Sequence, residues 1–310
     1  MNLRSILKKW EYKKYRLLWA AIPFLSKIGY LTKFPLHLDL ELSARCNLQC
    51  IHCPHSETYK NFAIGDMPFE MAANILKQGA IGEDGRAYSV KLQWRGESTL
   101  YSQLNNVIEI AHDLDYIDIM LNTNGNCKWG ILESAIENGL TYLAFSIDGA
   151  NKNDYLKIRK GGNFELVMEN LQGACKMMKS YPRLRVVLQA TVMDSANPKE
   201  LEKFVRILPD GCALKFRSAT WRMNLIKKPE GLKRQNCWQP WRRLLIDWQG
   251  NVCPCCASWD GHGKLGNVKD NSLQNIWREN IISEYRERLK DKSAWSFDPC
   301  KSCFSRESYK

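Results

Sequence analysis

The chain has 310 residues, of which 45% are hydrophobic and 25% are charged, so it is long enough for one large core and too apolar to be disordered. Its net charge of +12 is concentrated in residues 1–35, which carry +7, and in residues 211–243, which carry +8. Because the rest of the chain carries −3, the composition excludes a protein that coats nucleic acid with a uniformly basic surface.

The N-terminal residues 3–21 are predicted to form a basic helix. Such a helix, followed by the apolar side chains of Trp19, Ile22 and Phe24, could make a peripheral contact with an anionic membrane. We favour the simpler interpretation that the helix packs on the protein and leaves its lysines in water. The apolar residues at helical spacing are Leu3, Ile6, Leu7, Trp10, Leu17 and Leu18.

Twelve cysteines are many for a chain of this size. The apolar run at residues 17–25 is not a convincing secretory signal, because Pro23 interrupts it and no clear cleavage site follows. The run is also too short to span a bilayer. We therefore expect a cytoplasmic protein whose clustered cysteines bind metal rather than form disulfides.

From residue 37 onward the sequence alternates short strands with helices. We expect strands at 37–43, 88–94, 117–122, 142–146, 184–192 and 212–217. We expect the intervening helices near 67–79, 103–114, 129–138, 164–179 and 198–207. Six such steps predict an α/β fold in which a parallel sheet curls into a partial (β/α)6 barrel. In folds of this kind the active site gathers at the carboxyl ends of the strands.

Three cysteines, Cys46, Cys50 and Cys53, follow the first predicted strand with the spacing C-x3-C-x2-C. Thiolates from one tight loop can ligate three irons of a four-iron cluster and leave the fourth iron open to a cofactor or substrate. A zinc site is the alternative, but zinc usually takes four ligands, and His52 lies awkwardly within the same short loop. The spacing therefore favours an iron–sulfur cluster over zinc or buried thiols.

This loop resembles the cluster-binding loop of the radical S-adenosylmethionine (SAM) superfamily, and the resemblance extends over residues 37–217. Residues 94–98 end the second strand where the family has a Gly-Gly-Glu-Pro-like stretch. Arg95 replaces the first glycine and Ser98 the proline, whereas Gly96 and Glu97 remain. The other matching segments are residues 122–125, residues 146–149, Arg159 and residues 161–165.

The resemblance implies two cofactors, a [4Fe–4S] cluster and SAM. A flavodoxin- or ferredoxin-type reductant would supply the electron that cleaves SAM to a 5′-deoxyadenosyl radical, which abstracts hydrogen from the substrate. The implied cluster ligands are Cys46, Cys50 and Cys53, and the implied SAM-binding residues are His52, Gly96, Glu97, Ser146 and Arg159. Without the cysteines, Ser146 would be interpreted as a turn residue and Arg159 as part of a surface ion pair.

A second group of cysteines lies near the C-terminus. An alternating stretch before Gly250 and Asn251 predicts a β-hairpin, and a charged helix is expected near 279–291. The order resembles the short SPASM, or twitch, domain, which binds one auxiliary [4Fe–4S] cluster. The implied ligands are Cys237, Cys255, Cys300 and Cys303, with Cys253 or Cys256 as possible replacements for Cys255. A zinc ribbon is the alternative, and Cys127, Cys175 and Cys212 are interpreted as ordinary buried thiols.

The predicted organisation has four parts. Residues 1–35 form a basic helical segment, 36–222 the radical SAM core, 223–236 a basic linker and 237–310 the auxiliary-cluster domain. Basic side chains between the core and this domain could bind a substrate phosphate or carboxylate, or could simply be solvated. These side chains are Arg217, Arg222, Lys227, Lys228, Lys233 and Arg234.

Two reactions on a sugar-like or peptide substrate fit these features. In the first, the substrate radical loses a proton and passes an electron to the auxiliary cluster, which is a two-electron oxidation. In the second, Cys253 or Cys256 returns a hydrogen atom, as in a redox-neutral epimerase. We favour oxidation, because the C-terminal segment resembles that of radical SAM dehydrogenases acting on amino-cyclitol alcohols. A non-catalytic iron–sulfur electron carrier or scaffold is the alternative of another class.

Overall fold

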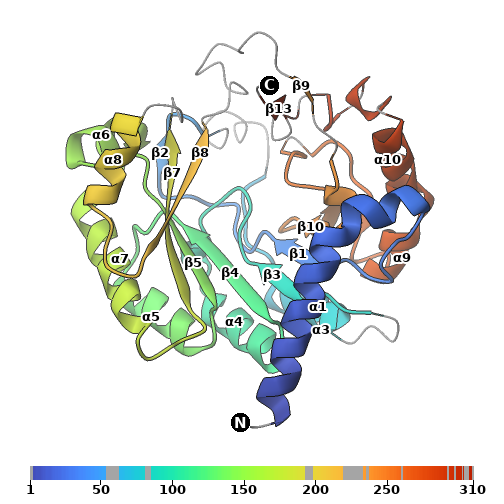
Figure 1. The fold of residues 1–310 in the computed structure, drawn as a ribbon, viewed down its shortest axis with the longest axis horizontal. Helices are drawn as coiled ribbons and strands as arrows, with labels where there is room; N and C mark the ends of the chain where they lie inside the picture. The colour runs from blue at the N-terminus through green and yellow to red at the C-terminus, as the bar shows by residue number, and fades with distance from the viewer. Residues whose placement is uncertain are drawn as a thin grey trace.

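A nine-stranded sheet runs through the molecule, with helices packed along it (Figure 1). The structure is a computed structural model. It describes residues 3–53, 63–80, 85–192, 198–218, 233–234, 237–259, 261–291, 293–296, 298–301, 303 and 307–308.

Six strands of this sheet form the predicted parallel core, and each pairs with the next in chain order. All five of these pairings are parallel, as expected of a partial (β/α)6 barrel. The predicted fold class is therefore confirmed. The strands are β1 (His37–Leu40), β3 (Ser89–Lys91), β4 (Asp118–Thr123), β5 (Tyr142–Ser146), β7 (Arg185–Val192) and β8 (Ala213–Ser218).

Helices connect these strands close to the predicted positions. They are α3 (Phe69–Ala80), α4 (Leu104–Asp113), α5 (Trp129–Glu137), α7 (Phe164–Met177) and α8 (Pro198–Arg206). Gly139 ends the turn after α5 with a φ of 106°, a conformation that favours glycine. One further helix, α6 (Lys152–Ile158), was not predicted from the sequence; the Asn151 side chain caps it by accepting a hydrogen bond from the Asp154 N–H at 3.0 Å.

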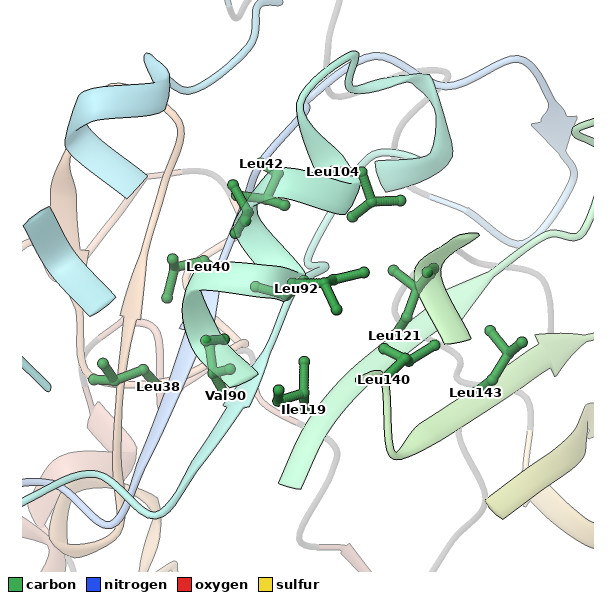
Figure 2. Packing of buried hydrophobic residues seen from close by; sticks show 14 of the residues in the cluster. Leu38, Leu40, Leu42, Val90, Leu92, Leu104, Ile119, Leu121, Leu140 and Leu143 are labelled. Carbon is green, nitrogen blue, oxygen red and sulfur yellow. The ribbon is translucent and has the colours of Figure 1, made fainter. Parts of the chain in front are cut away.

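Alternate residues of the core strands divide an apolar face from a polar one. Leu38, Leu40 and Leu42 belong to the buried apolar cluster that also contains residues of α3 and α4 (Figure 2). Asp39 and Glu41 point to the opposite face and are buried as well. The same apolar layer includes Val90, Leu92, Leu104, Ile119, Leu121, Leu140 and Leu143.

The C-terminal region extends the core sheet. β10 (Arg243–Ile246) pairs in parallel with β1, and β11 (Asn251–Cys253) and β12 (Gly266–Asn267) follow in antiparallel order. β10 and β11 form the hairpin predicted around Gly250, and α10 (Asn280–Lys290) is the predicted charged helix. α9 (Leu273–Arg278) precedes it. The predicted core and the predicted C-terminal domain therefore share one sheet.

The N-terminal helix α1 (Leu3–Leu25) is four residues longer than predicted and continues over Pro23. Its residues Tyr15 and Ile22 are buried in a cluster with Leu36, Tyr88 and Ile117, which directly precede β1, β3 and β4. α1 thus packs under the amino-terminal ends of these strands, which confirms the interpretation that it packs on the protein. Among the described residues, no helix is both long enough and apolar enough to cross a membrane.

The remaining elements are short. Two small antiparallel sheets pair β2 (Gln49–Cys50) with β6 (Arg159–Lys160) and β9 (Lys233–Arg234) with β13 (Glu307–Ser308). Short 3-10 helices occupy Ser26–Ile28, Ser98–Leu100, Gln239–Trp241 and Ser293–Ser296.

Candidate functional site

The residues predicted to bind SAM come from neighbouring segments around the carboxyl ends of the core strands. Gly96 and Glu97 follow β3, and Ser146 is the last residue of β5. His52 lies in the cysteine loop after β1, and Arg159 begins β6. Parallel strands present their carboxyl ends at one edge of a sheet, which is where an active site is expected.

The first cysteine loop is held by β2, in which Cys50 lies opposite Arg159 of β6. Inside the loop, the Cys53 N–H donates a hydrogen bond to the Cys50 carbonyl oxygen at 3.1 Å. Burial, and to a smaller degree Glu97, Cys50 and Cys53, raise the pKa of the Cys46 thiol to about 12. The three thiols therefore lie close enough to influence one another, and a metal must displace their protons to bind.

Gly96 brings the turn after β3 against the cysteine loop. A side-chain carbon at Gly96 would lie 2.6 Å from the carbonyl oxygen of Arg45, so the backbone leaves room for glycine only. The next residue, Glu97, donates its N–H to the same carbonyl oxygen at 2.7 Å. Because Arg45 precedes Cys46, this contact fixes where the cysteine loop begins.

Glu97 is buried beneath this contact, and its carboxylate holds two turns together. It accepts hydrogen bonds from the Thr99 N–H at 3.2 Å and hydroxyl at 2.9 Å, from the Thr123 hydroxyl at 2.8 Å and from the Asn124 N–H at 2.7 Å. Burial raises the pKa of Glu97, and these hydrogen bonds act in the opposite direction. The carboxylate thus links the ends of β3 and β4, and its contact with SAM stays a prediction.

Asn124 was missed as a site residue, although it lies in the segment that ends the third predicted strand. Its Nδ2 donates to Asn47 Oδ1 at 2.8 Å and lies 4.0 Å from the Cys46 Sγ. Its Oδ1 accepts a hydrogen bond from the Asn126 N–H at 2.8 Å. Only the position of Asn124 at a strand end pointed to it, because amides in such turns more often serve the turn itself.

A buried ionic group lies on the other side of the loop. Arg159 donates to Asp148 Oδ2 through Nε at 2.7 Å, and its Nη1 lies 3.9 Å from the Cys50 Sγ. His52 Nε2 is 3.3 Å from the same Asp148 oxygen, and burial lowers the pKa of His52 more than Asp148 raises it. Arg159 is therefore part of a buried ion pair and not of a surface one.

The donor chemistry of this site fits a cysteine-ligated cluster. Three thiols come from one loop, and the N–H groups of Asn124 and Arg159 approach two of the sulfurs. Hydrogen bonds to ligating sulfurs are one means by which proteins tune such clusters. In the described part of the chain, no three His, Cys, Asp or Glu side chains are arranged around a single metal ion. A four-iron cluster is larger than one ion and needs a wider arrangement of its ligands.

Two of the predicted auxiliary ligands, Cys237 and Cys303, lie near a third, Cys255. Burial, followed by the neighbouring Cys256, Cys237 and Cys303, raises the pKa of the Cys255 thiol well above its usual range. Cys300 adjoins this group, because the Cys303 N–H donates to the Cys300 carbonyl oxygen at 3.2 Å. The structure thus brings together the predicted cysteines at the C-terminus, and their role as ligands stays a prediction.

Cys253 and Cys256 flank Cys255 but differ in their surroundings. Cys253 is buried at the end of β11 and packs with Trp94 and Leu245, and this burial raises the pKa of its thiol to about 12. Cys256 is exposed, and its carbonyl oxygen accepts a hydrogen bond from Trp94 Nε1 at 3.2 Å. Both cysteines remain candidate hydrogen donors by prediction only.

The remaining cysteines carry no candidate chemistry. Cys175 and Cys212 are buried, as predicted, and they also contact each other, whereas Cys127 is only half-buried. All twelve cysteines are described, and none of them forms a disulfide.

Arg95 connects the turn after β3 to the C-terminal region. Its guanidinium forms two hydrogen bonds with the Glu41 carboxylate, at 2.7 and 2.6 Å, and donates to the Trp259 carbonyl oxygen at 3.2 Å. Its Cζ also lies 4.0 Å from the centre of the Trp94 ring, a cation–π contact. The sequence showed Arg95 only as a departure from the family's glycine, and this network gives the departure a structural role.

Comparison with known families decides what this arrangement represents. The sequence model of the radical SAM superfamily matches residues 40–208, which is more than half of the chain. The chain belongs to the radical SAM superfamily. A second model, SPASM, described as an iron–sulfur cluster-binding domain, matches residues 237–304. This radical SAM enzyme therefore has a [4Fe–4S] cluster and SAM as cofactors, and its SPASM region implies an auxiliary cluster.

Curated relatives of this radical SAM enzyme differ in how much of it they match. The chain is 25% identical over 176 residues to GTP 3′,8-cyclase of Petrotoga mobilis, covering 56% of this chain and 52% of that enzyme. It thus spans about half the length of the cyclases that it matches. It is 21% identical over 272 residues to the S-adenosyl-L-methionine-dependent 2-deoxy-scyllo-inosamine dehydrogenase of Niallia circulans, covering 86% of this chain and 91% of that enzyme.

Solved structures agree with the fold. The crystal structure of BtrN in complex with AdoMet and 2-DOIA has a TM-score of 0.59 and 17% identity, covering 87% of this chain and 93% of that one. Streptococcus suis SuiB bound to the precursor peptide SuiA has a TM-score of 0.67 and 15% identity, covering 89% and 72%. At these identities the likeness shows a common fold alone.

The predicted basic linker is only partly described. Arg222, Lys227 and Lys228 lie outside the described residues. Lys233 and Arg234 form β9, which pairs with β13, and Arg217 lies in β8. The predicted role of these side chains in substrate binding stays a prediction.

Proposed function

We propose that this radical SAM enzyme oxidises an alcohol carbon of a sugar-like substrate by two electrons, with the auxiliary cluster as the electron acceptor. The observation that carries the proposal is the similarity to the Niallia circulans dehydrogenase, which extends over 86% of this chain and 91% of that enzyme. The cyclases, in contrast, match little more than half of the chain. The group of cysteines around Cys255 supports a place for the second cluster.

The proposed reaction balances in atoms and electrons. With both clusters and SAM bound, the site would supply a 5′-deoxyadenosyl radical that takes the hydrogen atom from the alcohol carbon. The auxiliary cluster would accept the electron that the substrate radical then gives up. The hydroxyl group would lose its proton to solvent, so that the C–O single bond becomes C=O. An external reductant of the flavodoxin or ferredoxin type provides the electron that cleaves SAM.

The chain's own residues hold and orient these groups in the proposal. Cys46, Cys50 and Cys53 would ligate the first cluster, leaving one iron for SAM. Arg159, fixed by Asp148, would place a positive charge beside the Cys50 sulfur and stabilise its thiolate form. In the C-terminal region, Cys237, Cys255, Cys300 and Cys303 would ligate the auxiliary cluster.

The cluster count is the first test. The protein is purified and reconstituted without oxygen, and iron and sulfide are counted in wild type, in a Cys46/Cys50/Cys53→Ala variant and in a Cys300/Cys303→Ala variant. We expect about eight irons in the wild type and about four in either variant, since each set of cysteines holds one four-iron cluster. Four irons in the wild type, with zinc in the C-terminal site, would contradict an auxiliary cluster and therefore the oxidation.

The reaction itself is tested with candidate amino-cyclitols and sugars deuterated at the alcohol carbon. Oxidation transfers one deuterium to 5′-deoxyadenosine and yields a ketone. Epimerisation instead yields no ketone, and the product carries a hydrogen from solvent at the alcohol carbon. The Cys253→Ala or Cys256→Ala variant would then fail to return this hydrogen to the substrate. A protein that never cleaves SAM after reduction would be an electron carrier.

A peptide substrate is the second candidate. SuiB is seen with its precursor peptide and anSMEcpe with a Kp18Cys peptide, and both share the fold of this chain. Formation of 5′-deoxyadenosine that depends on a peptide, and not on any cyclitol or sugar, would favour this class.

A further inference from the structure

α1 and the 3-10 helix that follows it carry the most exposed large apolar side chains in the described part of the chain. These are Trp10 at 61% exposure, Leu17 at 70%, Phe24 at 72% and Ile28 at 79%. The next most exposed, Val205 on α8, reaches 58%. Single exposed apolar side chains are ordinary, but four of them along one short segment need an explanation.

The spacing of these residues places them in a stripe along one face of the helix, with Lys13 and Lys14 between Trp10 and Leu17. Trp10, Leu17 and Phe24 are each seven residues apart, so they lie within about 40° of one another around an α-helix. Ile28 continues the stripe into the 3-10 helix that follows α1. The stripe therefore follows one face and is not a scatter of separate side chains.

The rotation of α1 is fixed, so the stripe cannot turn inward. On the opposite face, Tyr15 stacks on Tyr88 with ring centres 5.6 Å apart and accepts a hydrogen bond from the Ser89 hydroxyl at 3.1 Å. Ile22 is fully buried. Turning Leu17 toward the core would expose these two residues, which together bury far more apolar surface.

Positive charges flank the stripe, and the one acidic residue of the segment faces away. Lys13, Lys14 and Arg16 are exposed, and the Lys14 Nζ lies 5.4 Å from the centre of the Trp10 ring. Glu11 instead reaches Arg86 of the body, with Nη1 and Oε2 3.8 Å apart. An apolar stripe bordered by cations matches the boundary between the acyl chains and the headgroups of an anionic membrane.

We propose that the outer face of α1 docks on the surface of an anionic phospholipid membrane. A second copy of the chain fits less well, because two such stripes facing each other would bring like charges together. α1 lies at the amino ends of β1, β3 and β4, whereas the first cysteine loop follows the carboxyl end of β1 (Figure 1). Docking through this face therefore does not require the first cysteine loop to touch the bilayer.

Flotation of the reconstituted enzyme with lipid vesicles tests this proposal. We expect binding to mixed phosphatidylcholine–phosphatidylglycerol vesicles, little binding to phosphatidylcholine alone, and weaker binding as salt increases. Leu17→Ser/Phe24→Ser should lower vesicle affinity by about tenfold or more, since two large apolar side chains leave the interface. Lys13→Glu/Lys14→Glu should have a comparable effect on anionic vesicles only.

Matched controls lie on the far helices. Val205→Ser removes an exposed apolar side chain, and Lys176→Glu/Lys203→Glu reverses two exposed lysines. Neither control should change vesicle binding, and all variants should keep the iron content and far-UV circular dichroism of the wild type. No binding to anionic vesicles, or an equal loss in the controls, would overturn the proposal. So would a lipid-free dimer that the α1 variants dissociate, because a second copy would then cover the stripe.

Discussion

Gly96 shows how much of the candidate site depends on a backbone contact at a single residue. A side chain there would meet the carbonyl oxygen of Arg45, which belongs to the backbone and cannot rotate away. The cysteine loop begins at the next residue, Cys46. Any shift that relieves the contact must therefore move the loop that is expected to hold the first cluster.

We predict that Gly96→Ala reduces the iron bound at the first site and leaves the C-terminal site loaded. The added carbon pushes the cysteine loop away from β3 and disturbs the spacing of its thiols. Iron content should fall from about eight toward about four per chain, and SAM cleavage should fall with it. Iron analysis and the yield of 5′-deoxyadenosine measure both effects.

Gly130→Ala is the matched control for this substitution. Nothing lies within 4 Å of a side-chain carbon at Gly130, which is in the first turn of α5. Because alanine favours a helix, this change should keep all iron and stabilise the protein by up to about 1 kcal/mol. Equal iron loss in both variants would show that Gly96 has no special place in the site.

At the scale of elements, buried ion pairs join strands that are far apart in the sequence. Asp39 of β1 accepts a hydrogen bond from Arg243 of β10 at 2.9 Å, and the two strands pair side by side. Burial alone would raise the pKa of Asp39, but Arg243 and His37 hold it well below its usual range. Asp39 is therefore charged in the folded protein and stabilises the attachment of β10.

We predict that Asp39→Asn lowers the free energy of unfolding by about 3 kcal/mol at neutral pH, because Arg243 loses its charged partner in a largely buried place. The folded-state pKa of Asp39 lies below its unfolded value of about 4. Its stabilising contribution is therefore complete above that pH and is lost as the pH falls below it. The difference in free energy of unfolding between the wild type and Asp39→Asn should therefore disappear at acid pH. Denaturant unfolding at several pH values measures this difference.

Glu202→Gln serves as the control for this prediction. Glu202 pairs with Arg206 on exposed α8 at 2.9 Å, where water and salt screen the charges. Glu202→Gln should therefore change the free energy of unfolding little at any pH. A difference for Asp39→Asn that stays constant down to acid pH would contradict a depressed pKa for Asp39.

The elements also show what could be predicted from the sequence. The core strands and long helices follow from hydrophobic periodicity, and the first cysteine loop follows from its spacing. The position of β10 beside β1 could not be predicted, since some 200 residues separate Asp39 from Arg243 and no local pattern records the pairing. The seven-residue α6 was missed because so short a helix gives a weak periodic signal.

The same limit applies to the polar residues of the site. Asn124 and Arg95 act through partners that the fold brings to them, so their residue type alone did not reveal them. The outer face of α1 is a similar case. The sequence predicted a basic helix with two possible roles, and only the rotation of the helix shows that Tyr15 is buried while Leu17 is exposed.

At the scale of the whole molecule, the two cysteine regions are joined through one buried network. Arg95, in the turn after β3, binds Glu41 of the core and the carbonyl oxygen of Trp259 in the SPASM region. Neighbouring Trp94 donates to the carbonyl oxygen of Cys256, which adjoins Cys255. The position of the auxiliary site relative to the core thus depends on this turn as well as on the shared sheet.

We predict that Arg95→Met destabilises the whole protein by about 3–5 kcal/mol, because Glu41 is left buried without its cation. Burial raises the pKa of Glu41, whereas the positive charge of Arg95 lowers it. Without Arg95, the pKa of Glu41 in the folded protein therefore rises further. A buried acid with a raised pKa destabilises the folded protein above its unfolded pKa of about 4. The free energy of unfolding of Arg95→Met should therefore fall further below that of the wild type as pH rises. Denaturant unfolding of the reconstituted protein measures this.

The double variant Glu41→Gln/Arg95→Met separates the loss of a charge partner from the loss of packing. Removing both charges leaves only Asp247, 4.0 Å from the Arg95 guanidinium, without this cation, so a large part of the stability should return and the pH dependence should weaken. The contact with Trp259 stays broken in both variants, so any loss of auxiliary iron that persists in the double variant reports on that contact. If the double variant is as unstable as Arg95→Met at every pH, the instability comes from the lost Trp259 contact and lost packing, and the unpaired charge of Glu41 is not its cause.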